Sequence, residues 1–287
     1  MEETMVKENK MGVLPVNKLL VTMSLPMMIS MLVQALYNIV DSIFVAKIEE
    51  KALTAVSLAF PIQTLMIAVG VGTAVGINAL LSRFLGEKEF EKADCVAKNG
   101  IFLAFISYLL FLLIGIFGVG IFYTSQTSDT VIINYGMEYL TIICVASFGI
   151  FMQATFEKLL QSTGKTFYAM ITQGTGAIIN IILDPILIFG YFGLKPMGVA
   201  GAAVATVIGQ CVAALLAVIM NVKVNTEIHV GMKGFKPDGR MIRQIYMIGI
   251  PSIIMQAIGS VMTYGMNRIL ITFTDTATAV FGVYFKL

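Results

Sequence analysis

The sequence contains few of the residues from which enzyme and metal sites are usually built. It has one histidine, three cysteines and only 13% charged residues. The single His229 lies in a polar segment, so no Ser-His-Asp or Cys-His arrangement is available for nucleophilic catalysis. Cys95, Cys144 and Cys211 are odd in number and far apart, which argues against a disulfide framework or a zinc site. The sequence therefore predicts neither an enzyme nor a resident cofactor.

The shortage of charge also excludes a soluble protein. Hydrophobic residues make up 57% of the 287 residues, and the mean hydropathy is +0.87, which leaves too little polar surface to cover a soluble globule. The net charge is only +2 and the basic residues are scattered among loops, so no nucleic acid partner is expected. The charged N-terminus has no small-residue cleavage site and precedes an apolar run too long for a signal peptide. We expect an integral membrane protein in contact with membrane lipid.

Apolar runs long enough to cross a bilayer occur seven times. A spanning helix needs about 20 mostly apolar residues, and none of the runs has the alternating pattern of a barrel strand. The sequence therefore predicts an all-α polytopic membrane protein, with a shorter eighth run from Ala277 to Leu287. The predicted spans cover residues 19–46, 53–84, 98–123, 131–157, 167–192, 198–221 and 242–273.

Lysine and arginine fall mainly on one side of these spans. Only Lys47, Lys51, Lys195 and Arg268 lie on the other side. Because loops rich in lysine and arginine stay in the cytoplasm, the N-terminus is predicted to be cytoplasmic in a multi-pass protein of the plasma (inner) membrane. The fourteen basic residues on the predicted cytoplasmic side are Lys7, Lys10, Lys18, Arg83, Lys88, Lys92, Lys98, Lys158, Lys165, Lys223, Lys233, Lys236, Arg240 and Arg243.

The sequence begins to repeat itself after a polar linker. Pro251 lies in a setting like that of Pro26, at an offset of 225 residues, and Thr278-Ala279-Val280 matches Thr54-Ala55-Val56 at nearly the same offset. Two copies that enter the membrane from the same side form a parallel repeat, which is one architecture of secondary transporters. We therefore predict four parts: a cytoplasmic tail (1–18), a six-helix N-terminal lobe (19–221), a cytoplasmic inter-lobe linker (222–241) and the start of a truncated C-terminal lobe (242–287).

The fifth span contains a carboxylate in the middle of an apolar run. A charge such as Asp184 at the bilayer centre costs roughly 2.5–3.5 kcal/mol, so this side chain is expected to face protein or a water-filled cavity. Asn180 lies four residues earlier on the same helical face, and Pro185, which has no N–H, should bend the helix beside the carboxylate. These residues favour an ion or proton site. The alternative is a buried aspartate that holds helices together through a hydrogen bond.

The first span carries a second carboxylate with polar neighbours. Gln34, Tyr37 and Asp41 share one helical face, Asn38 lies beside them, and the group is expected to line a cavity. Asp41 also lies near the end of its span, so solvation at the membrane interface is an alternative. Because two buried carboxylates can share a proton or coordinate a sodium ion, Asp41 and Asp184 form a plausible coupling site.

Two further polar side chains lie in predicted spans. The hydroxyl of Thr206 can complete a site with Asn180 and Asp184, or it can bond back to its own helix. Glu157, beside Lys158, is interpreted as an interfacial charge or as a contact of a cytoplasmic gate.

Small residues recur at four-residue spacing in the second and sixth spans. Small side chains at this spacing let helix backbones approach closely in lipid. We therefore expect close helix packing at Gly72 and Gly76, and at Gly201, Ala205 and Gly209.

Taken together, these motifs resemble the multidrug and toxic compound extrusion (MATE) transporters, and more closely their DinF-like bacterial and archaeal branch. The matching segments cover nearly the whole chain. They are Ser24-Leu25-Pro26 with Asp41, Asn180-Ile181-Ile182-Leu183-Asp184-Pro185 with Phe189-Gly190, Gly198 to Thr206, and Leu160 to Lys165.

The resemblance implies a fold of roughly twelve helices in two six-helix lobes. This chain would hold the N-terminal lobe, the seventh helix and the start of the eighth, and the missing C-terminal lobe would be needed for transport. The resemblance also implies secondary active multidrug efflux, in which small amphipathic or cationic drugs are exchanged for H+ or Na+. The implied cation-coupling residues are Tyr37, Asp41, Asn180, Asp184 and Thr206. Of these, Asp184, Asn180 and Thr206 are the candidate Na+ ligands. Gln34 would line the same cavity, and Pro26 and Pro185 would bend the helices.

Two other functions remain open at the level of sequence. A flippase for lipid-linked or polysaccharide precursors would be expected to line its cavity with basic residues that bind phosphate, and the spans contain almost none. A membrane structural or assembly subunit without transport would predict that Asp41→Asn and Asp184→Asn alter stability but no flux.

Overall fold

All the regular secondary structure of residues 10–232 and 234–286, which this computed structural model describes, is helical. The first nine residues of the predicted tail, with Lys7, lie outside the described residues, as do Lys233 and Leu287. The elements are α1 (Lys10–Val13), α2 (Val16–Ala46), α3 (Glu50–Gly86), α4 (Phe90–Leu113), the π-helix η1 (Ile114–Gly118), α5 (Val119–Gln126), α6 (Thr130–Val145), α7 (Phe148–Ser162), α8 (Thr166–Phe189), the 3-10 helix η2 (Tyr191–Gly193), α9 (Gly198–Val224), α10 (Gly239–Leu270) and α11 (Asp275–Lys286).

The helices confirm the all-α membrane architecture. Six helical segments of the described chain are long and apolar enough to cross a membrane, with α4, η1 and α5 forming one of them, and the bent pair of α6 and α7 makes a seventh. These seven correspond in order to the seven predicted spans. Helix ends differ from the predicted ones; α4, for example, begins at Phe90 because the polar segment before its apolar run is also helical.

The fourth span is broken near its middle. α6 ends at Val145 and α7 begins at Phe148, and the two helices are bent by 45°. No proline lies at the break, but Ser147 and Gly149 flank the first residue of α7, and serine and glycine together are a common setting for a sharp kink.

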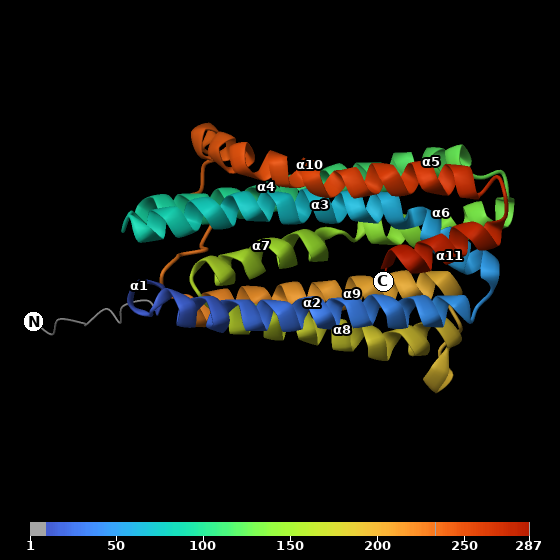
Figure 1. The fold of residues 1–287 in the computed structure, drawn as a ribbon, viewed down its shortest axis with the longest axis horizontal. Helices are drawn as coiled ribbons and strands as arrows, with labels where there is room; N and C mark the ends of the chain where they lie inside the picture. The colour runs from blue at the N-terminus through green and yellow to red at the C-terminus, as the bar shows by residue number, and fades with distance from the viewer. Residues whose placement is uncertain (1–9, 233, 287) are drawn as a thin grey trace, which may run out of the picture.

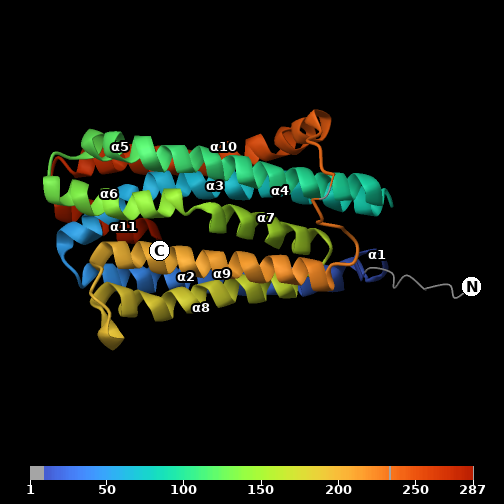
Figure 2. The ribbon, with the colours of Figure 1, turned by 180° about the vertical axis from the view of Figure 1, so that it is seen from behind.

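The helices lie side by side in two groups with the broken span between them (Figure 1). α8 packs against both α2 and α9, and α3 packs against both α4 and α10. The view from behind shows the same separation, with α6 and α7 between the two groups (Figure 2). α7 contacts α9 on one side and α3 on the other, so residues on α7 face the space between the groups.

The prolines lie within helices that continue through them. Pro26 is inside α2 and Pro251 inside α10, and these two helices run in the same direction (Figure 1), as a parallel repeat requires. Pro185 is inside α8, which extends without interruption to Phe189. Because proline has no N–H, the carbonyl of Ile181 lacks its usual helical donor one turn below Asp184.

Two glycines allow α10 to pack directly on α3. A Cβ atom on Gly72 would lie 2.8 Å from the backbone nitrogen of Ile253, and one on Gly76 would overlap the carbonyl oxygen of Ile245. The expected close packing at Gly72 and Gly76 is therefore confirmed. The partner is α10, a helix that the sequence assigns to the start of the second lobe.

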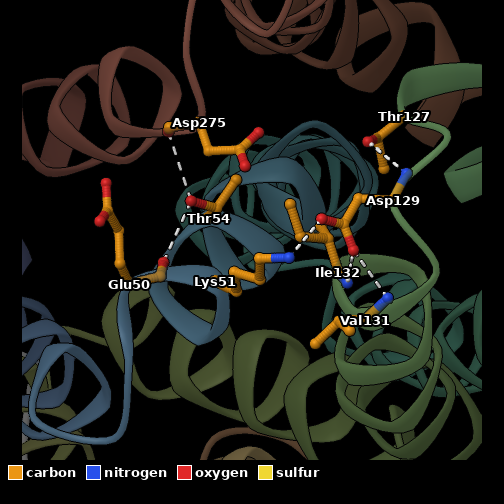
Figure 3. A network of polar contacts seen from close by, with 8 residues as sticks. All are labelled: Glu50, Lys51, Thr54, Thr127, Asp129, Val131, Ile132 and Asp275. Atoms are coloured by element: carbon orange, nitrogen blue, oxygen red, sulfur yellow. Dashed lines mark hydrogen bonds and ion pairs between the residues drawn. The ribbon is translucent and has the colours of Figure 1, made fainter.

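Polar contacts hold the starts of α3, α6 and α11 together at one end of the bundle (Figure 3). Lys51 Nζ lies 2.6 Å from Asp129 Oδ2, and the Asp129 carboxylate also caps α6. The Thr54 hydroxyl lies 3.1 Å from the carbonyl oxygen of Glu50 and 3.3 Å from that of Asp275. These contacts fix the first turn of α11 against the first turns of α3.

The segment between α9 and α10 is attached to α4. The backbone N–H of His229 donates to Asp94 Oδ1 at 2.7 Å, and the backbone N–H of Asp238 donates to Asn99 Oδ1 at 3.0 Å. This segment lies at the end of the bundle where α2 begins, which we call the basic end because it carries the loops after α3, α7 and α9 with most of the lysines and arginines.

Candidate functional site

A cavity of about 380 Å³ lies among α2, α3, α6, α7, α8 and α9. Its wall mixes apolar side chains with amide, hydroxyl and carboxyl groups, and no lysine or arginine of the described chain lines it. Such a cavity can hold a polar ligand away from lipid, because the cost of polar groups at membrane depth is met by protein contacts. The polar lining residues are Gln34, Tyr37, Asn38, Asp41, Gln63, Thr64, Tyr139, Gln153, Glu157, Gln173, Asn180, Thr206 and Gln210.

Every polar residue predicted on the cavity face of α2 lines this cavity. Gln34, Tyr37, Asn38 and Asp41 follow one another along that face. Asp41 is 5% exposed, so it is buried within the bundle and not solvated at the interface. Gln34 Oε1 accepts a hydrogen bond from Gln173 Nε2 on α8 at 2.9 Å, which joins the two helices across the cavity wall.

Glycines bring α8 and α9 into direct backbone contact. A Cβ atom on Gly209 would lie 2.7 Å from the carbonyl oxygen of Gly176 and 3.3 Å from the Cβ of Asn180, and one on Gly201 would lie 2.7 Å from the carbonyl of Leu187. The close approach expected at Gly201 and Gly209 is therefore confirmed. It places the side chains of Asn180 and Thr206 within hydrogen-bonding distance.

Asn180 is the centre of a hydrogen-bonded chain between α8 and α9. Its amide orientation is assigned from the network, as amide oxygens and nitrogens usually must be. In the orientation that satisfies both ends of the amide, Nδ2 of Asn180 donates to Asp184 Oδ2 at 3.0 Å. Oδ1 of Asn180 then accepts from the backbone N–H and the hydroxyl of Thr206 at 3.0 and 3.2 Å. The Thr206 hydroxyl thus contacts Asn180, and the alternative bond to its own helix is not formed.

Tyr37 connects α2 to this chain. Its hydroxyl lies near the Thr206 hydroxyl and within electrostatic range of both Asp41 and Asp184. Asp41 and Asp184 are themselves close enough to interact electrostatically. Asp184 is fully buried and does not line the cavity. The structure therefore brings together all five of the residues predicted for cation coupling, four at the cavity wall and Asp184 beneath it.

The donor set around Asp184 fits a proton or a hard monovalent cation. Asp184 Oδ1 is buried and has no hydrogen-bond partner among the described residues, so one carboxylate oxygen remains for a proton or an ion. The neighbouring groups of Asn180 and Thr206 supply neutral oxygens, the ligand type that hard cations prefer. No group of three or more histidine, cysteine, aspartate and glutamate side chains is found in the described chain, so the arrangement does not resemble a transition-metal site.

Glu157 is a cavity residue, although the sequence suggested either an interfacial charge or a contact of a cytoplasmic gate. It is 8% exposed and lines the cavity, which does not fit the interfacial position considered for it. Gln153 Nε2 donates to Glu157 Oε1 at 3.0 Å, and the Thr172 hydroxyl donates to the same oxygen at 3.3 Å. The four-residue spacing of Gln153 and Glu157 inside an apolar span was the available sequence signal.

Other cavity residues were not predicted at all. Gln63 on α3 donates to the hydroxyl of Tyr139 on α6 at 3.1 Å, and Gln210 on α9 also lines the cavity. Each lies in a mainly apolar span, where a polar residue marks a protein-facing position without indicating which cavity it faces.

The fold and sequence are similar to those of known exporters. Multidrug export protein MepA of Staphylococcus haemolyticus (strain JCSC1435) is 31% identical over 276 residues, which cover 94% of this chain and 59% of that protein. The MepA of Staphylococcus aureus (strain NCTC 8325 / PS 47) is 29% identical over 283 residues, which cover 95% of this chain and 60% of that protein. Both relatives are named as multidrug export proteins.

Two solved structures of a multidrug resistance MATE family transporter of the MOP superfamily are similar throughout the described fold. The inward-facing conformation has a TM-score of 0.83 at 29% identity and is matched over 93% of this chain and 60% of that chain. The outward-facing conformation has a TM-score of 0.81 at 30% identity, over 92% and 58% of the two chains. This chain thus spans about three-fifths of the length of the proteins it matches.

The match to a family model covers most of the elements that build the site, although not α9, which carries Thr206. The MatE family model matches residues 26–186, from Pro26 in α2 to the residue after Pro185 in α8. That segment is more than half of the 287 residues, and the chain therefore belongs to the MatE family.

Proposed function

We propose that this chain forms the N-terminal lobe and the first helices of the second lobe of a plasma-membrane transporter that exports small amphipathic or cationic drugs in exchange for H+ or Na+. The proposal is carried by one observation: α2, α8 and α9 gather Asp41, Asn180, Asp184 and Thr206 at a polar cavity. The staphylococcal relatives are named multidrug export proteins, which supports drugs as the substrate. This chain spans about three-fifths of those relatives, and the proposal therefore includes a second lobe as a requirement for export.

The coupling ion would act by neutralising two neighbouring carboxylates. Two negative charges repel each other strongly in a low-dielectric interior. A proton on Asp184, or a sodium ion held by Asp184, Asn180 and Thr206, removes that repulsion. The two ions differ in what they require of Asn180: its nitrogen faces Asp184 in the hydrogen-bonded arrangement, whereas its oxygen would have to turn toward a bound Na+.

Binding of the ion would then change the shape of the helices that carry it. A ligand shifts a conformational equilibrium only through its different affinity for the two states. Asp41 shares α2 with Pro26, and Asp184 shares α8 with Pro185; each proline removes one backbone hydrogen bond and so lowers the cost of bending. We propose that the ion enters from outside, α2 and α8 reshape, and the drug leaves outward.

The distribution of charge supports a cytoplasmic N-terminus. The loops after α3, α7 and α9 lie at the basic end with the start of α2, whereas Lys47, Lys51, Lys195 and Arg268 lie at the opposite end. The positive-inside rule then places the basic end in the cytoplasm. The cation-coupling residues would lie in the outer half of the membrane, since Asp41 and Asp184 are both near the helix ends that lie away from the basic end.

The test is dye efflux in cells that lack other pumps, using the longest chain that the gene encodes. Sodium and proton gradients are imposed separately on wild type, Asp41→Asn and Asp184→Asn, with membrane content measured by immunoblot. We expect efflux driven by one gradient and lost in both variants. Glu138→Gln is the control, because it removes an exposed carboxylate of α6 that is outside the cavity. Absence of efflux under both gradients in wild type would refute drug export.

The alternatives have less support. A flippase for phosphate-bearing lipid precursors needs basic cavity residues, and no lysine or arginine of the described chain lines the cavity. A structural or assembly subunit predicts that Asp41→Asn and Asp184→Asn change stability without changing flux, so the efflux assay separates it from a transporter.

A further inference from the structure

Glu157 is a buried carboxyl group that forms no ion pair within the described chain. It is 92% buried, as 8% of its surface remains exposed, and it lines the cavity. Both of its hydrogen bonds, from Gln153 and Thr172, end on Oε1, so Oε2 has no hydrogen-bond partner among the described residues. A buried carboxyl group in a membrane bundle is costly and is usually retained for a function.

The basic residues closest to Glu157 in sequence have other partners. Lys158 Nζ donates to Gln161 Oε1 at 2.7 Å, so Lys158 acts on Glu157 only through its longer-range field. Lys165 Nζ donates to Asn225 Oδ1 at 3.2 Å. The protein therefore supplies hydrogen bonds that hold Glu157 in place but no cation that contacts it.

Glu157 lies far from the cation-coupling residues. Its partner Thr172 and Asp184 are both on α8, twelve residues apart, and at 1.5 Å per residue this is an axial separation of about 18 Å. Glu157 is therefore near the basic end, whereas Asp184 is near the opposite end. The two carboxyl sites therefore lie at different levels of the bundle, although Glu157 and Asp41 line the same cavity.

The face of α7 around Glu157 combines apolar and amide groups. Ile150, Gln153, Ala154 and Glu157 all line the cavity, because their spacing puts them on one side of the helix. Apolar side chains suit the body of a lipophilic molecule, and a fixed carboxylate suits a positive charge at one end of it.

We propose that Glu157 is the counter-ion for the positive charge of the exported substrate, so that the cavity binds monovalent lipophilic cations in preference to neutral molecules of the same shape. This assignment rests on the proposed export function and names its substrate class. The substrate charge and the coupling ion then bind at different carboxylates, Glu157 at the basic end and the Asp41 and Asp184 pair at the opposite end.

The test is equilibrium dialysis on the longest chain that the gene encodes, purified in detergent. The probes are tetraphenylphosphonium, a monovalent cation, and triphenylphosphine oxide, a neutral molecule of related shape. Glu157→Gln keeps the size of the side chain and an oxygen for Gln153, and it should weaken tetraphenylphosphonium binding at least about tenfold while changing triphenylphosphine oxide binding less than about twofold. Glu157→Asp, which keeps the charge, should retain more cation binding than Glu157→Gln. Glu138→Gln should change neither probe.

Each outcome decides the assignment. Selective loss of cation binding in Glu157→Gln, with the size-exclusion profile unchanged, supports it. Equal weakening of the binding of both probes would show that Glu157 has a structural role. Unchanged cation binding in Glu157→Gln, or loss of cation binding in Asp41→Asn alone, would show that the positive charge binds elsewhere. Each of these three results overturns the assignment, as does a wild type that binds neither probe. Selective cation binding that depends on Glu157, without dye efflux in the cell assay, would support the role of Glu157 as counter-ion and refute drug export. Failure of the counter-ion assignment is therefore distinguishable from failure of the proposed export function.

Discussion

The hydroxyl of Thr206 on α9 lies 3.2 Å from the side-chain amide of Asn180 on α8. Thr206 also lies near Tyr37 on α2. The Thr206 hydroxyl therefore links α9 to α8 beside α2, at the level of the proposed cation-coupling residues. Because Asn180 in turn donates a hydrogen bond to Asp184, a substitution of Thr206 should also affect the Asp184 carboxylate, with which Thr206 forms no direct hydrogen bond.

Thr206→Val should destabilise the protein by about 1–3 kcal/mol, because valine keeps the shape but leaves the buried Asn180 amide without one partner. The free energy of unfolding in detergent measures this change. Thr175→Val is the control, since the Thr175 hydroxyl bonds to the carbonyl of Ile171 in its own helix and joins no other helix. Equal effects of the two substitutions would contradict the role given to Thr206.

Gly209→Ala should separate α8 from α9. The added Cβ atom would lie 2.7 Å from the backbone oxygen of Gly176, and backbone cannot move aside as a side chain can. We expect a loss of about 1–3 kcal/mol in the free energy of unfolding, typical of overpacking. Gly174→Ala, on α8 with nothing within 4 Å of its added Cβ, should leave stability unchanged or raise it by up to about 1 kcal/mol. A neutral Gly209→Ala would show that the two helices do not need this contact.

Gly76→Ala should weaken the attachment of α10 to α3, because its Cβ atom would overlap the carbonyl oxygen of Ile245. Amide hydrogen exchange of α10 should become faster, since local opening becomes less costly. Gly265→Ala on α10 meets nothing within 4 Å and should not speed exchange. Protection of α10 that is the same in Gly76→Ala as in wild type would contradict this packing.

The ion pair of Lys51 and Asp129 should make stability depend on pH in the acid range. The hydrogen bond from Lys51, together with that from the backbone N–H of Val131, holds the pKa of Asp129 below its usual value. The ion pair therefore contributes fully to the free energy of unfolding above the unfolded-state pKa of aspartate, about 3.9. This contribution is lost as pH falls through the lower pKa of Asp129 in the folded state.

Asp129→Asn tests this contribution, because asparagine still caps α6 but cannot form the ion pair. The difference in thermal midpoint between wild type and Asp129→Asn should be constant from pH 7 to about pH 5 and should shrink below about pH 4. A difference that persists unchanged at pH 3 would show that the ion pair is not its source. The pair is partly exposed, so salt should also reduce the difference.

Much of the membrane architecture was determined by the sequence alone. A bilayer requires about 20 apolar residues per helix, and apolar runs of that length are visible without any knowledge of packing. Helical periodicity likewise placed Gln34, Tyr37 and Asp41 on one face and Asn180 and Asp184 on another, because residues three, four or seven apart share a face in any helix. The small residues at Gly72, Gly76 and Gly209 indicated close contacts for a similar local reason.

Only the tertiary structure decided which faces meet. Nothing local indicates that Gly76 packs against Ile245 or that Gly209 packs against Gly176. Glu157 accepts a hydrogen bond from Thr172, which belongs to the next helix. Periodicity specifies directions within one helix, whereas a cavity is formed by several helices whose rotations and crossings are set jointly by side-chain packing.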